Sequence, residues 1–209
     1  MKRLIGLFMC LILLLITSCI SFNNLSDDEI DAVSTHIVSY VGLTDVNAET
    51  FKTAFKDFYK ENLISFSYDS LEHKYFISPY YSADAQVYFG VNSKGNVWNR
   101  LRGSYNGSDW LFVDKVVFYG NDEKWMKDGL YWSIKSDVSS TSYSVTVYEE
   151  YDVLITNNEL PKLLKITNGS ECVIRTYGTY GNFVSQILSD KQTKAQYSVL
   201  LLESLLLAK

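Results

Sequence analysis

The spacing of apolar residues changes near Leu63, and this change limits the possible folds of the 209-residue chain more than any other feature. Before Leu63, apolar residues recur every three or four positions, as from Ile30 to Ile37, which indicates helices. After Leu63, apolar and polar residues alternate, as in 64–68 and 86–91, which is typical of strands with one buried face. We therefore predict an α+β fold in which helices and strands occupy separate parts of the chain.

The sequence predicts two helices before the strands and one after them. Ser26 and Glu29 form a capping-box pattern at the start of the first helix, and Gly42 is suited to end it. The second helix is expected over 47–61. A second capping-box pattern at 189–192 begins a C-terminal amphipathic helix. Its apolar part is too short to cross a bilayer, so we expect it to pack on the sheet.

The region between the helices is expected to form seven to nine antiparallel strands, arranged as one sheet or as a sandwich. Asn-Gly-Ser-Asp at 106–109 is expected to close a hairpin at the centre of the fold, and Asn-Gly at 168–169 a second hairpin. A strand is also expected over 130–134. The expected organisation is a leader, a tether, a helical segment, an antiparallel β domain and a C-terminal helix, with bounds 1–18, 19–25, 26–62, 63–188 and 189–209.

The first nineteen residues have the pattern of a bacterial export signal. Lys2 and Arg3 give a positive start, and 4–16 is an apolar core shorter than the roughly 20 residues that a spanning helix needs. The tetrapeptide Ile-Thr-Ser-Cys that ends at Cys19 resembles the lipobox of bacterial lipoproteins. This resemblance implies cleavage before Cys19, acylation of its thiol and anchoring in a membrane by lipid chains. An uncleaved anchor and an ordinary secretory signal are the alternatives.

Charge and cysteine content fit an envelope protein that does not bind nucleic acid. Without residues 1–18, 17 basic residues stand against 24 acidic ones, a net charge of −7, so membrane contact is expected from the lipid and not from a basic patch. By resemblance to enteric lipoproteins, Ile20 in place of aspartate implies the outer membrane or its periplasmic side. With Cys10 removed and Cys19 acylated, Cys172 has no disulfide partner and is expected to be buried.

Two segments of the body resemble an uncharacterised group of bacterial lipoproteins and phage-related proteins. They are RLRGSYNGSDWLFVDKVVFYG at 100–120 and ECVIRTYGTYGNFVSQILSDKQ at 171–192, which together make up about a fifth of the chain. This resemblance implies a fold and no particular reaction.

Four residues are candidates for ligand binding. Arg100 and Arg102 share one face of a predicted strand, where they can bind an anionic ligand or pair with acids of a neighbouring strand. Tyr177 and Tyr180, in the segment YGTYG, can form a sugar-binding platform, although the packing of a hairpin explains them equally well.

The sequence contains no strong catalytic signature. Glu149, Glu150 and Asp152 lie along one strand, where two of them can act as a glycosidase pair or all can protect an edge strand from aggregation. His36 and His73 lack the spacing of a zinc site, and no nucleotide-binding fingerprint occurs, so neither metal nor cofactor is expected. We therefore expect a lipid-anchored envelope protein without catalysis of its own, which binds another envelope protein or a polymer. The alternatives are a glycan or peptide hydrolase and a carbohydrate-binding module.

Overall fold

The computed structural model describes residues 24–140 and 145–208, and the fold is α+β as predicted. The helices in these ranges are α2 (Asp27–Val41), α3 (Asp45–Lys60), α4 (Leu160–Thr167) and α5 (Asp190–Leu207). The strands are β1 (Ile64–Asp69), β2 (Lys74–Pro79), β3 (Ala85–Asn92), β4 (Val97–Gly107), β5 (Val113–Gly120), β6 (Glu123–Lys127), β7 (Lys135–Ser140), β8 (Val145–Ile155), β9 (Val173–Gly178) and β10 (Phe183–Ile187). The predicted leader and Cys19 lie outside the described residues.

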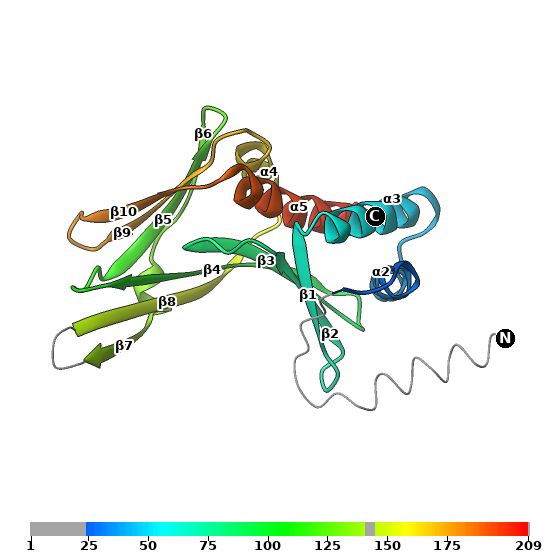
Figure 1. Ribbon diagram of the computed structural model, residues 1–209, viewed down its shortest axis with the longest axis horizontal. Helices are drawn as coiled ribbons and strands as arrows, with labels where there is room; N and C mark the ends of the chain where they lie inside the picture. Colours follow the sequence, from blue (N-terminus) through cyan, green and yellow to red (C-terminus); the bar gives the residue numbers. More distant parts are fainter. Residues whose placement is uncertain (1–23, 141–144, 209) are drawn as a thin grey trace.

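The strands form two antiparallel sheets (Figure 1). The six-stranded sheet has the order β1-β2-β3-β4-β8-β7, and the four-stranded sheet has the order β10-β9-β5-β6. The described residues thus contain ten strands, more than the seven to nine expected, and they are divided between two sheets. Figure 1 shows α2 and α3 at one end of the long axis of the molecule and the four-stranded sheet at the other.

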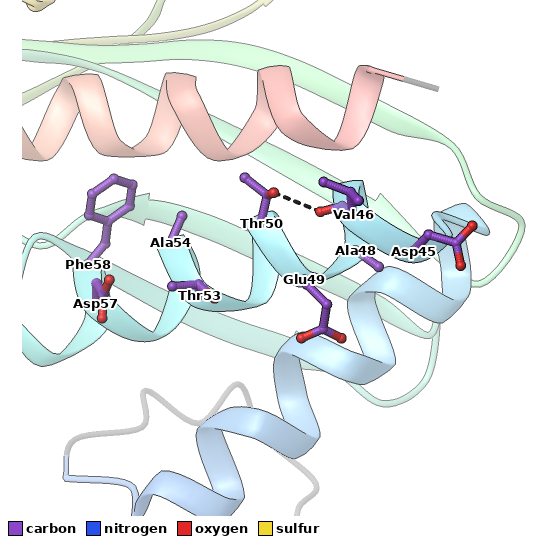
Figure 2. A pocket seen from close by; sticks show the side chains of 9 residues that line it. All are labelled: Asp45, Val46, Ala48, Glu49, Thr50, Thr53, Ala54, Asp57 and Phe58. Atoms are coloured by element: carbon purple, nitrogen blue, oxygen red, sulfur yellow. Dashed lines mark hydrogen bonds between the residues drawn. The ribbon is translucent and has the colours of Figure 1, made fainter.

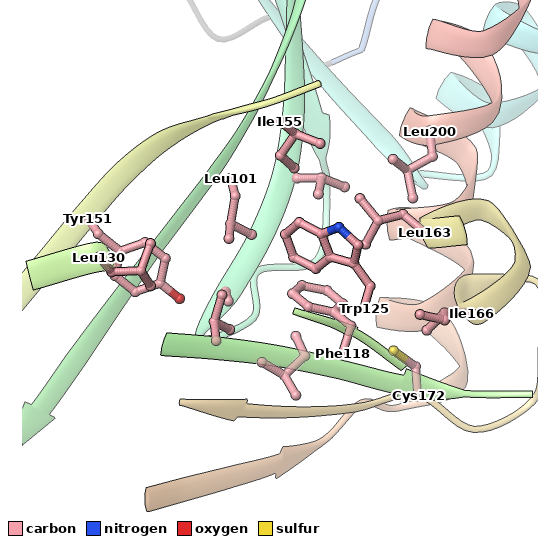
Figure 3. Close-up of a cluster of buried hydrophobic side chains, with 14 of the residues drawn as sticks. Leu101, Phe118, Trp125, Leu130, Tyr151, Ile155, Leu163, Ile166, Cys172 and Leu200 are labelled. Carbon is pink, nitrogen blue, oxygen red and sulfur yellow. The ribbon is translucent and has the colours of Figure 1, made fainter. Parts of the chain in front are cut away.

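A cluster of buried side chains joins the two sheets (Figure 3). Leu101 and Tyr151 contribute from the six-stranded sheet, and Phe118 and Trp125 from the four-stranded sheet. The rings of Phe118 and Trp125 pack edge to face with their centroids 5.7 Å apart. Cys172 belongs to the same cluster and is fully buried, as predicted. Burial of large apolar side chains, worth about 1.5–3 kcal/mol each, holds the sheets together.

A second cluster lies between the six-stranded sheet and helices α2, α3 and α5. The aromatic stripe of the second predicted helix is part of it, because Phe51 and Phe55 are fully buried with ring centroids 5.8 Å apart. Phe55 also packs on Phe66 of β1, at a centroid distance of 5.6 Å. Leu202 and Leu206 of α5 complete the cluster, so the C-terminal helix packs on the sheet.

Both capping boxes are confirmed. The hydroxyl of Ser26 accepts from the N–H of Glu29 at 3.4 Å, and the Glu29 carboxylate accepts from the N–H of Ser26 at 2.9 Å. Ser189 and Gln192 repeat this arrangement at the start of α5, at 3.3 and 3.0 Å. Gly42 ends α2 with a left-handed φ of +73°, a conformation that glycine adopts at little cost.

Helix α5 buries polar as well as apolar residues, so more of its circumference is buried than the single apolar face of an amphipathic helix. Gln196 and Glu203 are at most 1 % exposed. The Gln196 side-chain oxygen accepts from the N–H of Val87 at 3.0 Å, and Val87 precedes Phe89, the first residue of β3 that pairs with β2. This bond satisfies a strand edge that would otherwise lie unpaired in the interior. The prediction of an amphipathic helix therefore understates how deeply α5 lies in the fold.

The predicted central hairpin within 100–120 is wrong, because β4 belongs to the six-stranded sheet and β5 to the four-stranded sheet. The buried carboxylate of Glu149 on β8 stabilises the crossover between them. Its Oε1 accepts from the N–H groups of Leu111 and Phe112 at 2.8 and 2.9 Å, and its Oε2 from that of Val113 at 2.7 Å. Phe112 takes a left-handed φ of +55° there. The hydrogen bonds to Glu149, which is distant in sequence, therefore outweigh the tendency of residues 106–109 to close a hairpin.

The hairpin predicted at 168–169 and the strand predicted over 130–134 are wrong as well. The apolar run before the Asn-Gly pair is helix α4, in which Leu163 and Ile166 are fully buried, and residues 130–132 form a short 3-10 helix. Apolar runs this short fit a helix as well as a strand, so tertiary packing decides between them. The predicted β domain therefore contains a helix.

Candidate functional site

Arg100 and Arg102 lie on the outer face of β4, opposite the buried Leu101. Arg100 Nε donates to Oδ1 of Asp152 on β8 at 2.6 Å, and its Nη2 donates to the main-chain oxygen of Asp152 at 2.8 Å. The hydroxyl of Tyr88 donates to the other carboxylate oxygen at 2.7 Å. Arg100 thus pairs with an acid of a neighbouring strand, which is the alternative to an anion site that the sequence left open.

Arg102 is held by uncharged neighbours. Its guanidinium carbon lies 5.3 Å from the ring centroid of Tyr88. Its Nε and Nη2 are each 2.6 Å from the Gln86 carboxamide oxygen in the amide orientation that satisfies both residues. We call the surface formed by Tyr88, Arg100, Arg102 and Asp152 the ion-paired face. Both guanidinium groups there already have hydrogen-bond acceptors, which argues against an anion site.

The outer face of the four-stranded sheet carries cations among aromatic rings. On β9, Arg175 and Tyr177 point away from the core that buries Ile174 and Thr176. The strand registers place eleven residues on this side of the sheet, which we call the aromatic–cationic face and on which all but Val117 are at least partly exposed: Lys115, Val117, Tyr119, Lys124, Met126, Val173, Arg175, Tyr177, Phe183, Ser185 and Ile187. None of these residues is acidic. The face is therefore positively charged in a chain whose formal net charge is −5.

Two cations of the aromatic–cationic face, Lys115 and Arg175, lie over rings. Lys115 Nζ is 4.7 Å from the ring centroid of Tyr177. The guanidinium carbon of Arg175 lies 5.3 Å from the centroid of Tyr119 and 5.1 Å from that of Phe183. The rings of Tyr177 and Phe183 are 5.3 Å apart. Exposed cation–π contacts contribute about 0.5–1 kcal/mol each and, unlike an ion pair, leave the positive charge uncompensated.

No acid in residues 24–140 and 145–208 forms an ion pair with Lys115 or Arg175. The hydroxyl oxygens of Tyr119 and Tyr177 are 3.4 Å apart. Hydrogen bonding with Tyr119, and then with Arg175, lowers the pKa of Tyr177, whereas the contact between the two tyrosines raises the pKa of Tyr119. Either hydroxyl can be the donor in this contact. The face therefore combines cations that no acid neutralises with two neighbouring hydroxyl groups.

Tyr180 does not share the aromatic–cationic face with Tyr177. It lies in the turn between β9 and β10 and is 81 % exposed. Its ring meets that of Phe112 edge to face at 5.7 Å, and Phe112 stacks on Trp110 at 6.0 Å. The structure thus places the two tyrosines of the YGTYG segment in separate ring contacts.

Sequence reasoning missed Lys115, Tyr119, Arg175 and Phe183. A signal existed, because Lys115 and Tyr119 on one strand, and Arg175 and Tyr177 on another, recur with a period of two. That period shows which residues share a face of one strand. It does not show which strands pair. β5 and β9 pair with each other, although β6, β7, β8 and α4 lie between them in the sequence.

The three acids considered for glycoside hydrolysis have other roles or are dispersed. Glu150 and Asp152 share the outer side of β8 and Glu149 faces inward, as predicted. Both oxygens of Glu149 accept main-chain hydrogen bonds, and Asp152 is bonded to Arg100 and Tyr88. Neither of these two carboxylates is available to act on a substrate.

The two histidines, which are far apart in sequence, meet in one cluster of tyrosines. His36 Nδ1 is 2.8 Å from the hydroxyl of Tyr75, and His73 Nδ1 is 3.0 Å from that of Tyr68. Tyr40 and Tyr68 link the two pairs, with hydroxyl oxygens 3.4 Å apart. Burial lowers the pKa of His36. Among the described residues, no group of three or more His, Cys, Asp and Glu side chains is placed to hold a metal ion.

Two further candidate sites lack the geometry of an active site. Burial raises the pKa of Cys172 to about 12, so it stays a thiol at neutral pH. Figure 2 shows an open groove along α3, lined by Asp45, Val46, Ala48, Glu49, Thr50, Thr53, Ala54, Asp57 and Phe58. All of these residues belong to one helix, and the carboxylates in Figure 2 point apart. The groove therefore has no convergent polar groups of the kind that catalysis needs.

No family model, no curated protein and no solved structure matches this chain. The resemblance of 100–120 and 171–192 to bacterial lipoproteins therefore stays a prediction, as does the lipobox that ends at Cys19. In the part of the chain that the structure describes, no helix is both long enough and apolar enough to cross a membrane.

Proposed function

We propose that the protein is a lipid-anchored, non-catalytic binding module of the bacterial cell envelope, with the aromatic–cationic face as its binding surface. One observation carries the proposal: Lys115 and Arg175 lie over the rings of Tyr177, Tyr119 and Phe183 without an acid to neutralise them. Cations in this setting keep their charge for a partner, and the rings supply apolar contact area. Tyr and Arg are also enriched among residues that contribute most to binding energy.

The N-terminal sequence supports an anchored location. Cys19 ends the lipobox-like tetrapeptide and precedes α2 by only a few residues. Because α2 and the four-stranded sheet lie at opposite ends of the long axis (Figure 1), a lipid on Cys19 would hold the α2 end near the membrane. The aromatic–cationic face would then point into the envelope.

The fate of the candidate catalytic groups supports a module without catalysis. Glu149 is engaged by main-chain N–H groups, Asp152 by an arginine and a tyrosine, and Cys172 is buried as a thiol. A hydrolase needs such groups to converge on a pocket that admits substrate.

Co-purification tests the binding surface. The mature full-length chain is extracted from envelopes in mild detergent, and the components that co-purify are compared between the wild type, Arg175→Gln and Arg100→Gln. We expect Arg175→Gln to lose the partner. Arg100→Gln, the same exchange on the ion-paired face, should retain it. Equal retention by both variants would contradict the assigned surface.

Mass analysis of the mature amino terminus tests the anchor. We expect a glyceride-modified Cys19 as the first residue and partition of the protein into the detergent-rich phase. Cys19→Ser should move it to the aqueous phase. An intact Met1, or an unmodified Cys19 on native material, would remove the lipid from the proposal and leave the binding surface to be judged separately.

A further inference from the structure

We infer that the ligand of the aromatic–cationic face is an anionic polysaccharide, whose sugar rings stack on Tyr177 and Phe183 and whose acidic groups bind Arg175 and Lys115. The inference rests on the proposed function, because it names the class of ligand for the same surface. The acidic groups are carboxylates or phosphates carried by the sugar units.

The rings provide a platform of suitable size for sugar units. Tyr177 and Phe183 are cross-strand neighbours on β9 and β10, with centroids 5.3 Å apart and Phe183 51 % exposed. Exposed aromatic faces pack against apolar surfaces, and the C–H faces of sugar rings are such surfaces. The hydroxyl groups of Tyr119 and Tyr177, 3.4 Å apart, lie where they can exchange hydrogen bonds with sugar hydroxyls.

The cations add the selection for negative charge. Lys115 lies against the Tyr177 ring, and Arg175 lies between the rings of Tyr119 and Phe183, so cations alternate with rings across the sheet. A guanidinium group binds carboxylate and phosphate in a bidentate manner, and a lysine adds a point charge. The chain as a whole is acidic. A polyanion is therefore repelled by most of the molecule and attracted to this face.

A membrane surface is the principal alternative, because it also offers anionic groups and an apolar layer. Ile187 and Met126, 75 % and 49 % exposed on the same face, would suit such a surface. The position of the face argues against it. The four-stranded sheet lies at the end of the molecule remote from α2, the first described helix after the proposed anchor (Figure 1).

Binding of three soluble polymers to the full-length mature chain in detergent micelles tests the inference. Polygalacturonate carries both sugar rings and carboxylates, dextran carries uncharged rings, and poly-glutamate carries carboxylates without rings. We expect binding of polygalacturonate that is at least about tenfold tighter than that of either control. This binding should weaken strongly at about 1 M salt, where the screening length falls to about 3 Å.

Variants assign the binding to the face. Arg175→Gln and Phe183→Ser should each weaken polygalacturonate binding about tenfold, the first by removing charge and the second by removing a ring. Arg100→Gln on the ion-paired face should leave the affinity unchanged. Thermal unfolding of each variant shows whether the fold is intact. If Phe183→Ser fails to fold, Tyr177→Leu tests the same platform.

Four outcomes would overturn the inference. Equal affinity for poly-glutamate would show that charge alone is recognised. Equal affinity for dextran would show that the charge is irrelevant. Vesicles of phosphatidylglycerol and phosphatidylcholine that bind in an Arg175-dependent manner, when polygalacturonate does not bind, would assign the face to the membrane. If none of these probes binds but an envelope protein co-purifies through Arg175, the ligand class is wrong and the proposed binding module stands.

Discussion

The two outer sheet faces both present an arginine beside aromatic rings, yet they leave it in different states. Arg100 is bonded to Asp152 of the adjacent strand, 2.6 Å away. Arg175 has Val117 and Ser185 as cross-strand neighbours, and neither can neutralise it. The availability of a surface cation therefore depends on the residues opposite it in the sheet, and not on its own position along a strand.

The largest effect on stability is expected from loss of the Glu149 carboxylate, which stabilises the crossover from β4 in one sheet to β5 in the other. Glu149→Ala removes the acceptor of the N–H groups of Leu111, Phe112 and Val113. Each buried N–H left unpaired costs about 1–3 kcal/mol, so we expect the free energy of unfolding to fall by roughly 3–5 kcal/mol. Glu150→Ala, on the outer side of the same strand, should change it by less than about 0.5 kcal/mol. Urea unfolding measures both, and similar losses would refute the role of Glu149.

A carboxyl group on the inner side of the six-stranded sheet differs from that of Asp152 because it is buried and, within residues 24–140 and 145–208, is not part of an ion pair. Glu203 of α5 is 1 % exposed, and neither of its carboxyl oxygens has a hydrogen-bond partner in the described residues. Burial raises its pKa from 4.5 to about 8, and the neighbouring Asn99 lowers it by less. The folded state therefore holds the proton more strongly than the unfolded state does. The stability that depends on this proton is full below pH 4.5 and is lost as the pH rises towards about 8.

Glu203→Gln removes this dependence, because glutamine has the shape of the protonated acid and does not ionise. We expect the variant to match the wild type at about pH 4 and to exceed it by roughly 4 kcal/mol at about pH 8. Urea unfolding at the two pH values measures the difference. An equal difference at both would mean that the carboxyl group does not enter the fold protonated.

A carboxylate introduced beside Arg175 should convert the aromatic–cationic face into an ion-paired one. Ser185→Asp places an acid opposite Arg175 on β10, where an exposed pair changes the free energy of unfolding by at most about 1 kcal/mol. Affinity for polygalacturonate should fall about tenfold, because the cation is neutralised and the new acid repels the ligand. Ser185→Asn is the uncharged control in the same binding titration. If the two variants bind equally well, the charge of Arg175 is not what the ligand recognises.

Removal of the acid beside Arg100, the reverse of adding one beside Arg175, should have the smallest effect on stability and binding. Asp152→Asn breaks the partly exposed pair with Arg100 and should lower the free energy of unfolding by less than about 1 kcal/mol. It should also add weak, salt-sensitive binding of polygalacturonate to a chain that carries Arg175→Gln. Thermal unfolding and binding titration measure the two effects. A loss well above this value would mean that the ion pair stabilises the sheet more than surface pairs usually do.

Features that depend on neighbours in sequence could be predicted. The start of α2 follows from Ser26 and Glu29, and that of α5 from Ser189 and Gln192, because each capping box closes within one helical turn. The opposite orientation of Glu149 relative to its neighbours on β8 also follows from the period of two. The two hairpins could not be predicted correctly from the sequence, because an Asn-Gly pair indicates a turn but does not determine whether the next strand returns to the same sheet.

The α+β class, the starts of α2 and α5 and the outward side of β4 and β8 follow from the sequence, because they depend on bonds within one helical turn or on the alternation along one strand. The separation of β4 and β5 into different sheets, the neutralisation of Arg100 and the lack of an acid beside Arg175 become visible only in the folded chain. These outcomes depend on strands that meet from distant parts of the chain, as Asp152 meets Arg100 from 52 positions away. The sequence of either segment alone does not predict a cross-strand contact of this kind.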